Sequence, residues 1–239
     1  MVSGKELPLI SSDDLRRMAV FRCADSVASP EEIQSVLHDG LFAANRDLTC
    51  LPEDQLQQVV TALLKPSRVA HVLGCRDTAV DLAKVWGANV TDAARAALLH
   101  DVTKALDGPL QLTLCEAYGI ILDVFSTENP KTLHALTGSL VAERVFGENP
   151  AVVAAIRSHT TGKADMNVLE KIIYVADYME PNRDFVGVEE LRQLAYSDID
   201  KALQLGLEMT ISMLIEQGKE IAPASQAALA FLKKGQIVC

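Results

Sequence analysis

Apolar residues recur at steps of three and four positions through most of the chain, and sustained two-residue alternation is almost absent. Examples of this spacing are Val80, Ala83, Ala93, Ala96 and Ala97. Such spacing collects apolar side chains on one side of an α-helix, whereas a half-buried strand alternates at every second residue. The pattern therefore predicts an all-α fold.

Helix-capping residues divide the pattern into segments of ordinary helix length. In chain order, the expected signals are a start at Pro66–Ser67, a stop at Gly87, an N-cap at Thr91–Asp92, a start at Asn149–Pro150, an N-cap at Asn167, a stop at Glu180–Pro181, and a break between Gly218 and Pro223. Together they predict a bundle of several helices.

The first sixty or so residues differ from the rest. They carry two turn-like clusters, Ser11–Asp13 and Ala28–Pro30, before a short helix that is expected to end at Gly40. We place a domain boundary at residues 49–53. The expected domains are an N-terminal arm, residues 1–52, and a helical domain, residues 53–239.

Composition narrows the class of protein. The 239 residues are 49% hydrophobic, 23% charged and 5% aromatic, which is typical of a helical globular protein and excludes disordered, fibrous and aromatic-rich β proteins. The formal charge of -10 argues against a surface that binds nucleic acid, although it allows a local positive pocket.

Neither a membrane span nor a secretion signal is expected. The longest stretch without Asp, Glu, Lys or Arg covers residues 221–232, which is shorter than the ~20 apolar residues of a spanning helix. The N-terminus lacks a basic start followed by an apolar core. The five cysteines form no CxxC pair, and their odd number does not suggest a disulfide framework, so we expect reduced thiols and a cytoplasmic location.

Histidine and aspartate residues provide the candidate chemistry. The dipeptide His100–Asp101 closes an apolar run, and Asp177 lies inside the apolar stretch IIYVADYME. His71, His134 and His159 also lie among core-type residues. Burying any one of these groups alone would be costly, whereas a shared cation would compensate all of them. The fifth histidine, His38, lies in the arm and is assigned no role.

The order of these residues resembles the HD superfamily of metal-dependent phosphohydrolases. The stretches LLHDVTK, SHTTGK and YVADYMEPNR are similar to its YqeK-like branch, which hydrolyses dinucleoside tetraphosphates symmetrically, and the resemblance covers about Lys65 to Leu232. It implies an HD-domain helical bundle, a dinucleoside polyphosphate substrate such as diadenosine tetraphosphate, and ADP as product. The implied metal ligands are His71, His100, Asp101, His134, His159 and Asp177.

Four imidazoles and two carboxylates divide naturally between two metal ions, with Asp101 placed to bridge them. Such a pair can hold a water molecule as hydroxide, which is the expected nucleophile. Mixed nitrogen and oxygen donors accept Fe, Mn, Co and Zn, and iron is implied by the resemblance alone.

Further residues are expected to bind substrate. Lys104, three residues beyond Asp101, is expected one helical turn on, where its ammonium reaches a phosphoryl oxygen and assists catalysis. Arg68 either orients a ligand or contacts phosphate, and Ile221 and Pro223 are similar to a family loop that lines a nucleoside pocket. The complete expected substrate-binding set is Arg68, Gly74, Lys104, Thr160, Thr161, Gly162, Lys163, Arg183, Ile221 and Pro223.

The arm carries a second resemblance. LISSDDLR and SPEEIQSVLHDGLF are similar to the C-terminal tail of nicotinate-nucleotide adenylyltransferases, with Asp13 in place of the usual threonine. Their catalytic HxGH-type motif is absent from this sequence, so adenylyl transfer is not expected. The arm is either the remnant of a fusion of the two enzymes or an independent structural element.

Two alternatives to symmetrical tetraphosphate hydrolysis stay open at this point. The first is an HD enzyme for another phosphate ester, such as a nucleoside monophosphate or a cyclic nucleotide, because only the shape of the pocket separates these substrates. The second is a non-catalytic nucleotide-binding module. Metal storage is disfavoured by the small supply of cysteine and carboxylate ligands. A dimeric assembly is compatible with the sequence.

Overall fold

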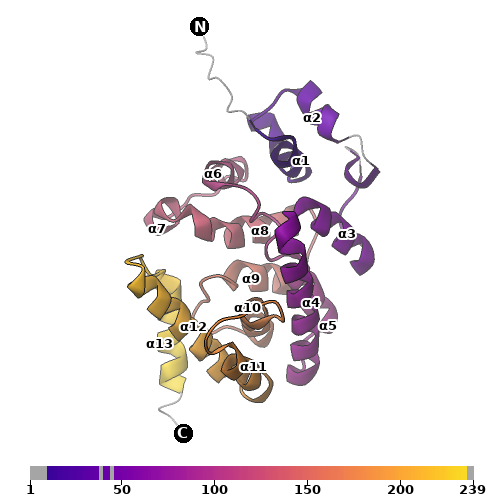
Figure 1. The fold of residues 1–239 in the computed structure, drawn as a ribbon. Coiled ribbons are helices and arrows are strands. Elements are labelled where there is room, and N and C mark those ends of the chain that lie inside the picture. Colours follow the sequence, from indigo (N-terminus) through magenta and orange to yellow (C-terminus); the bar gives the residue numbers. More distant parts are fainter. Residues whose placement is uncertain (1–9, 38–39, 44–45, 236–239) are drawn as a thin grey trace.

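The computed structural model describes residues 10–37, 40–43 and 46–235, and it is helical without a strand in these ranges (Figure 1). The prediction of an all-α fold is confirmed. None of the described helices is both long and apolar enough to cross a bilayer. The elements are α1 (Ser12–Val20), η1 (Ala24–Ser26), α2 (Pro30–Val36), η2 (Gly40–Phe42), α3 (Glu53–Leu63), α4 (Pro66–Trp86), α5 (Val90–Leu99), α6 (Gly108–Ala117), α7 (Val124–Glu128), η3 (Pro130–Thr132), α8 (Leu133–Arg144), α9 (Pro150–Ser158), α10 (Val168–Met179), α11 (Val188–Ser197), α12 (Ile199–Glu216) and α13 (Pro223–Gly235).

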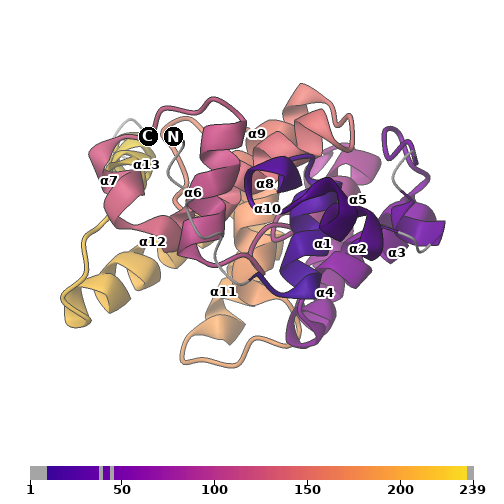
Figure 2. The same cartoon turned by 90° about the horizontal axis from the view of Figure 1, so that it is seen from above.

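The centre of the bundle consists of α4, α5, α8, α9 and α10. Helix α10 packs against α4, α5 and α9, and α9 packs in turn against α5 and α8. Figures 1 and 2 show α12 and α13 at one end of this group, with α1 and α2 near the other. The side chains that face inward are aliphatic and fully buried, for example Leu82, Leu98 and Ile156. Their burial supplies the main driving force for this packing.

Most of the expected helix boundaries are observed. Pro66 is the first residue of α4, and the helix ends at Gly87, which adopts φ +68°, a conformation that favours glycine. Asn149 and Asn167 cap α9 and α10 through their side chains. Helix α10 stops directly before Glu180, and the break between α12 and α13 falls in the expected segment.

Three local expectations were wrong. The side chain of Asn89 caps α5 by accepting from the Asp92 amide, so Thr91 and Asp92 lie inside the first turn. The helix expected to end at Gly40 ends at Val36. The two turn-like serine clusters are helix starts, because Ser11 and Ser29 each accept a backbone amide as N-caps.

The N-terminal arm docks on the rest of the molecule through buried hydrogen bonds. Arg17 Nε donates to the Leu63 carbonyl at 2.7 Å, and the Tyr118 hydroxyl donates to the Phe21 carbonyl at 2.7 Å. Helix α3 begins at the expected boundary, at Glu53. The division into an arm and a separate HD domain stays a prediction. His38 and the first residue of the LISSDDLR stretch lie outside the described residues.

Candidate metal centre

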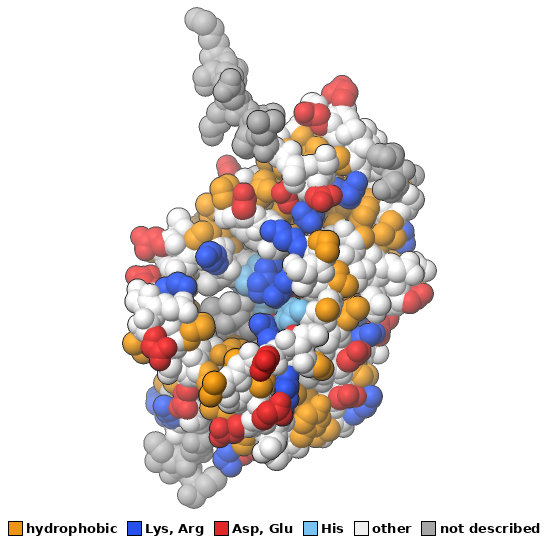
Figure 3. All heavy atoms as spheres, viewed as in Figure 1, with side chains coloured by type: hydrophobic (Ala, Val, Ile, Leu, Met, Phe, Trp, Pro, Cys, Tyr) orange, Lys and Arg blue, Asp and Glu red, His pale blue; other side chains and the backbone are white. Residues whose placement is uncertain are grey.

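Four histidine side chains, each on one of four helices or directly after it, meet in the interior of the bundle. His71 lies on α4 and His134 at the start of α8, while His100 and His159 follow the last residues of α5 and α9. The Nε2 atoms of His71 and His100 are 3.4 Å apart, and those of His134 and His159 are 3.2 Å apart. Figure 3 shows histidine side chains in a hollow of this face, beside Lys and Arg side chains.

Hydrogen bonds to the opposite ring nitrogen fix the tautomers of these histidines. His100, His134 and His159 each direct Nδ1 to the backbone carbonyl oxygen three residues earlier, at 2.6–2.7 Å. His71 directs Nδ1 to the buried carboxylate of Glu180 at 3.1 Å. Because a carbonyl or carboxylate oxygen only accepts, Nδ1 carries the proton and Nε2 presents a lone pair. Four lone pairs therefore point into one space.

Asp101 lies between the two histidine pairs and is fully buried. Its Oδ2 lies 3.7 Å from Nε2 of His71 and 3.4 Å from Nε2 of His100. Its Oδ1 lies 3.5 Å from Nε2 of His134 and 3.7 Å from Nε2 of His159. Each carboxylate oxygen thus faces one pair, which is the arrangement that a bridging ligand requires.

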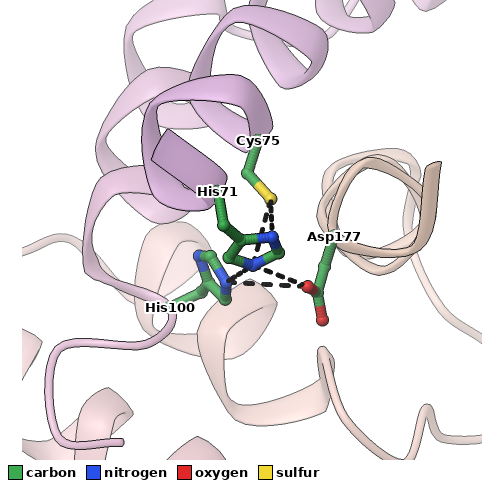
Figure 4. Close-up of side chains that lie close together, drawn as sticks. All are labelled: His71, Cys75, His100 and Asp177. Atoms are coloured by element: carbon green, nitrogen blue, oxygen red, sulfur yellow. Dashed lines mark hydrogen bonds and ion pairs between the residues drawn. The ribbon is translucent and has the colours of Figure 1, made fainter. Parts of the chain in front are cut away.

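Asp177 lies beside the histidine pair formed by His71 and His100. Its Oδ1 lies 3.0 Å from Nε2 of His71 and 3.8 Å from Nε2 of His100 (Figure 4). Cys75, one turn after His71 on α4, places its buried sulfur 3.6 Å from the same His71 nitrogen. These four side chains, like His100, Asp101 and His159, form a group whose donor atoms are close enough to hold one cation.

The donor atoms fit a pair of metal ions. Donors bound at ~2.1 Å to one cation lie about 3.0–3.4 Å from each other, close to the separations between the Nε2 atoms. Two facing lone pairs repel unless a proton or a cation lies between them. In addition, Asp101 Oδ1 is buried and, apart from its ion pair with Lys104 at 3.1 Å, has no hydrogen-bond partner among the described residues. A cation on each side of Asp101 would satisfy all these groups.

The electrostatics keep the ligands in their metal-binding forms. Burial lowers the pKa of His134 to about 3, assisted by the positive charge of Lys104, so the imidazole is neutral at pH 7. Burial alone would raise the pKa of Asp101, but its neighbours His100 and Lys104 hold the pKa of this carboxyl well below its usual range. The Asp177 pKa is likewise held low, against its burial, by its contacts with His71 and His100. Both carboxylates are ionised.

Three cationic side chains pair with these carboxylates. The Arg68 guanidinium contacts Asp101 Oδ2, and the Lys104 ammonium lies 3.1 Å from Asp101 Oδ1. Arg183 donates to Asp177 Oδ1 at 2.9 Å. Lys104 was expected on a helix, but α5 ends before it and residues 101–105 form turns. Its position three residues beyond Asp101 nevertheless brings the two side chains together.

Sequence reasoning missed the group that orients His71. Glu180 is 1% exposed, and its Oε2 accepts from both the amide and the side chain of Asn182. Gly74 faces this carboxylate, and a Cβ there would lie 2.5 Å from Glu180 Oε2. Gly74 was expected to contact substrate, whereas its described neighbours are Glu180 and Asn182. Cys75 was missed too, because the spacing of one cysteine after a histidine carries no specific signal.

The four residues after His159 have different surroundings. The Thr160 hydroxyl lies 3.1 Å from Nε2 of both His134 and His159. Thr161 is half-buried. Gly162 adopts φ +64° and packs against α12 and α13, while Lys163 pairs with buried Glu170 at 2.8 Å. Of this segment, only Thr160 reaches the histidine nitrogens.

Ile221 lies between α12 and α13, and Pro223 is the first residue of α13. Pro223 lines a cavity of about 230 Å³ with Arg157, Thr161 and Leu133, and Ile221 lines an adjoining cavity of about 330 Å³. Because Leu133 and Thr161 neighbour His134 and Thr160 in the sequence, the first cavity is adjacent to the histidine cluster.

Comparisons with known proteins agree with this geometry. The HD domain model matches residues 68–182, which contain all six candidate ligands. Two proteins named symmetrical bis(5'-nucleosyl)-tetraphosphatase are similar to this chain. One from Halalkalibacterium halodurans is 40% identical over 71% of this chain and 91% of the relative. One from Bacillus subtilis is 35% identical over 72% of this chain and 92% of the relative.

A solved structure of an HD superfamily protein is also similar to this chain. The crystal structure of a protein from Clostridium acetobutylicum, described as a predicted HD superfamily hydrolase involved in NAD metabolism, is 36% identical and superposes with a TM-score of 0.75. The match covers 77% of this chain and 98% of that chain. On its helices, its histidine–aspartate cluster and these relatives, the chain belongs to the HD-domain hydrolases, in the family of the symmetrical bis(5'-nucleosyl)-tetraphosphatases.

Proposed function

We propose that this protein hydrolyses dinucleoside tetraphosphates symmetrically at a two-metal centre, with diadenosine tetraphosphate as substrate and two ADP molecules as products. The observation that carries the proposal is the position of Asp101, whose two oxygens each face one histidine pair. The names of the two bacterial relatives supply the substrate class.

The metal ions would be held in two halves. His71, His100, Asp177 and Asp101 Oδ2 form one half, and His134, His159 and Asp101 Oδ1 form the other. Bound cations supply Lewis acidity, which lowers the pKa of a water molecule and neutralises phosphate oxygens. The donor set accepts Fe, Mn, Co or Zn, and we propose iron on the family resemblance.

The charges of the pocket suit an anionic chain. The carboxylates of Asp101, Asp177 and Glu180 are balanced by Arg68, Lys104 and Arg183. Two divalent cations would therefore leave a surplus of about four positive charges, which matches the roughly four negative charges of a tetraphosphate. We expect the three basic side chains, which border the centre, to bind and orient the phosphates.

The reaction consumes one water molecule. Its oxygen forms a bond to one of the two inner phosphorus atoms, and the bridging oxygen leaves with the other half of the substrate. Each half then retains two phosphates, which gives two nucleoside diphosphates. A cytoplasmic location, which the sequence leads us to expect, and a dimeric assembly, with which the sequence is compatible, stay predictions.

Product analysis tests the proposal. Protein loaded with Fe(II) is incubated with diadenosine tetraphosphate, and the nucleotides are separated by chromatography. We expect ADP alone. The Asp101→Ala variant should release none, whereas Asp54→Ala, which removes an exposed carboxylate on α3, should behave as the unmodified protein.

Two results would contradict the proposal. ATP together with AMP would indicate asymmetrical cleavage. Intact substrate in the presence of bound metal, combined with hydrolysis of a nucleoside monophosphate or a cyclic nucleotide, would reassign the site to another phosphate ester.

A further inference from the structure

Symmetrical cleavage requires binding sites for two nucleosides. Because the cleaved bond is at the middle of the substrate, two identical halves extend from the metal centre. The segment around Ile221 and Pro223 offers a site for one of them. The following inference rests on the proposed function and concerns the other half.

A second cavity opens directly beside the metal centre. It has a volume of about 430 Å³ and lies between the start of α6 and the segment formed by η3 and α8. Its volume is within the ~300–1,000 Å³ range of small-molecule sites. We call it the α6 cavity, and it is lined by Lys104, Leu106, Asp107, Gly108, Gln111, Pro130, Lys131 and His134.

The segment from Pro130 to Leu136 separates this cavity from the one near Pro223. Pro130, Lys131 and His134 face the α6 cavity, whereas the intervening and following residues line the other cavity. In Figure 1, α6 and α13 lie on opposite sides of α8. A substrate centred on the metal ions would therefore find one cavity on each side of this segment.

The lining of the α6 cavity suits a nucleoside diphosphate. Leu106 and Pro130 provide apolar walls for a base, and Lys104 and Lys131 provide positive charge for its phosphates. The positions of two further polar groups are fixed by hydrogen bonds. Asp107 Oδ1 accepts the Leu110 amide, which holds a carboxylate at the wall, and Gln111 Nε2 donates to the Thr103 carbonyl.

We propose that the α6 cavity binds the second nucleoside diphosphate half of the substrate, with its phosphates directed to Lys104 and the metal centre. The site thus has two chemically different subsites for two identical halves. It follows that the metal-loaded protein binds two ADP molecules per chain, and that closing the α6 cavity removes one of them.

Gly108 offers a variant that closes the cavity. It is the first residue of α6, and a Cβ there would lie 3.3 Å from the Pro130 side chain across the lining. Gly108→Leu should fill this space. Gly40→Leu is the matched control, because Gly40 lies in the arm with no described atom within 4 Å of an added Cβ.

Calorimetric titration with ADP measures the stoichiometry. We expect two ADP per chain for the metal-loaded protein and for Gly40→Leu, and one for Gly108→Leu. Lys131→Glu provides a second variant if Gly108→Leu does not fold, since its exposed side chain changes charge without changing the core. It should weaken one of the two ADP sites by at least about tenfold, as expected for reversal of a charge beside phosphate.

The outcomes separate this inference from the proposed function. One ADP per chain in the unmodified protein, or full binding in both α6 cavity variants, would overturn the inference while hydrolysis could still proceed. Failure of the unmodified protein to hydrolyse diadenosine tetraphosphate would overturn the function. The ADP titration would still decide whether the α6 cavity is a nucleotide site.

Discussion

Glu180 and His71 form a buried pair in which the carboxylate Oε1 lies 3.1 Å from Nδ1 of the imidazole. The pair fixes the ring so that Nε2 faces His100 and Asp177. The other three histidines use backbone carbonyl groups for the same purpose. His71 is thus the one member of the cluster whose orientation depends on a side chain that can be exchanged by mutation.

Glu180→Gln should weaken metal binding without unfolding the protein. The amide keeps the size of the carboxylate but removes the charge that polarises His71, and such changes in outer-sphere partners typically reduce metal affinity about 10–100-fold. Competition with a chromogenic chelator measures the affinity. Glu190→Gln, an exposed change on α11, is the control. Equal affinities for the two variants would show that Glu180 has no orienting role.

Gly74→Ala should destabilise the protein, in contrast to the usual effect of alanine in a helix. An added Cβ would lie 2.5 Å from Glu180 Oε2 and 3.2 Å from Asn182 Nδ2, so these groups would have to move. We expect a loss of about 1–3 kcal/mol in the free energy of unfolding. Urea titration compares it with Gly40→Ala, where the added methyl group meets no described atom. A more stable Gly74→Ala variant would refute the close contact.

Arg68→Ala should raise the affinity for metal and lower the affinity for substrate. Its guanidinium contacts Asp101 Oδ2, so its removal frees a metal-binding oxygen and removes a like charge. We expect metal affinity to rise, and the KM for the anionic substrate to rise on the order of tenfold. Arg76→Ala on the same helix, which loses a pair with Glu53, is the control. Weaker metal binding by Arg68→Ala would mean that Arg68 supports the metal site instead.

Arg17→Met should loosen the N-terminal arm while leaving the metal centre intact. The buried hydrogen bond from Arg17 to the Leu63 carbonyl links α1 to α3, and such charged bonds contribute about 1.5–3 kcal/mol. Hydrogen exchange should show faster exchange of α1 amides, with an unchanged metal content. Arg16→Met is the comparison, because Arg16 donates to Val36 within the arm. Faster exchange throughout the bundle would argue against a separate arm.

The helices could be predicted from the sequence because their signals are local. The left-handed Gly87 and the side-chain caps at Asn149 and Asn167 act within a few residues of themselves. The error at the start of α5 has the same origin. Asn89, Thr91 and Asp92 are all good capping residues, and only the geometry shows that Asn89 accepts the Asp92 amide.

The candidate ligands could be proposed because buried histidines and aspartates need a common explanation, but their supporting contacts could not. Glu180 lies 109 residues from His71 in the sequence, and its role depends on how α10 packs against α4. Lys163 was expected beside the metal centre, since it follows His159 closely. The turn at Gly162 instead directs it to Glu170, a contact that no local pattern indicates.

Metal counting in single-ligand variants tests the two-metal account most directly. The unmodified protein, reconstituted with Fe(II) and freed of excess metal, should contain two ions per chain by elemental analysis. His71→Ala and His159→Ala should each retain one ion per chain, because the two histidines belong to different halves of the cluster. Asp101→Ala should reduce the metal content of both halves. A single ion per chain in the unmodified protein, or an unchanged content after loss of either histidine, would contradict the account.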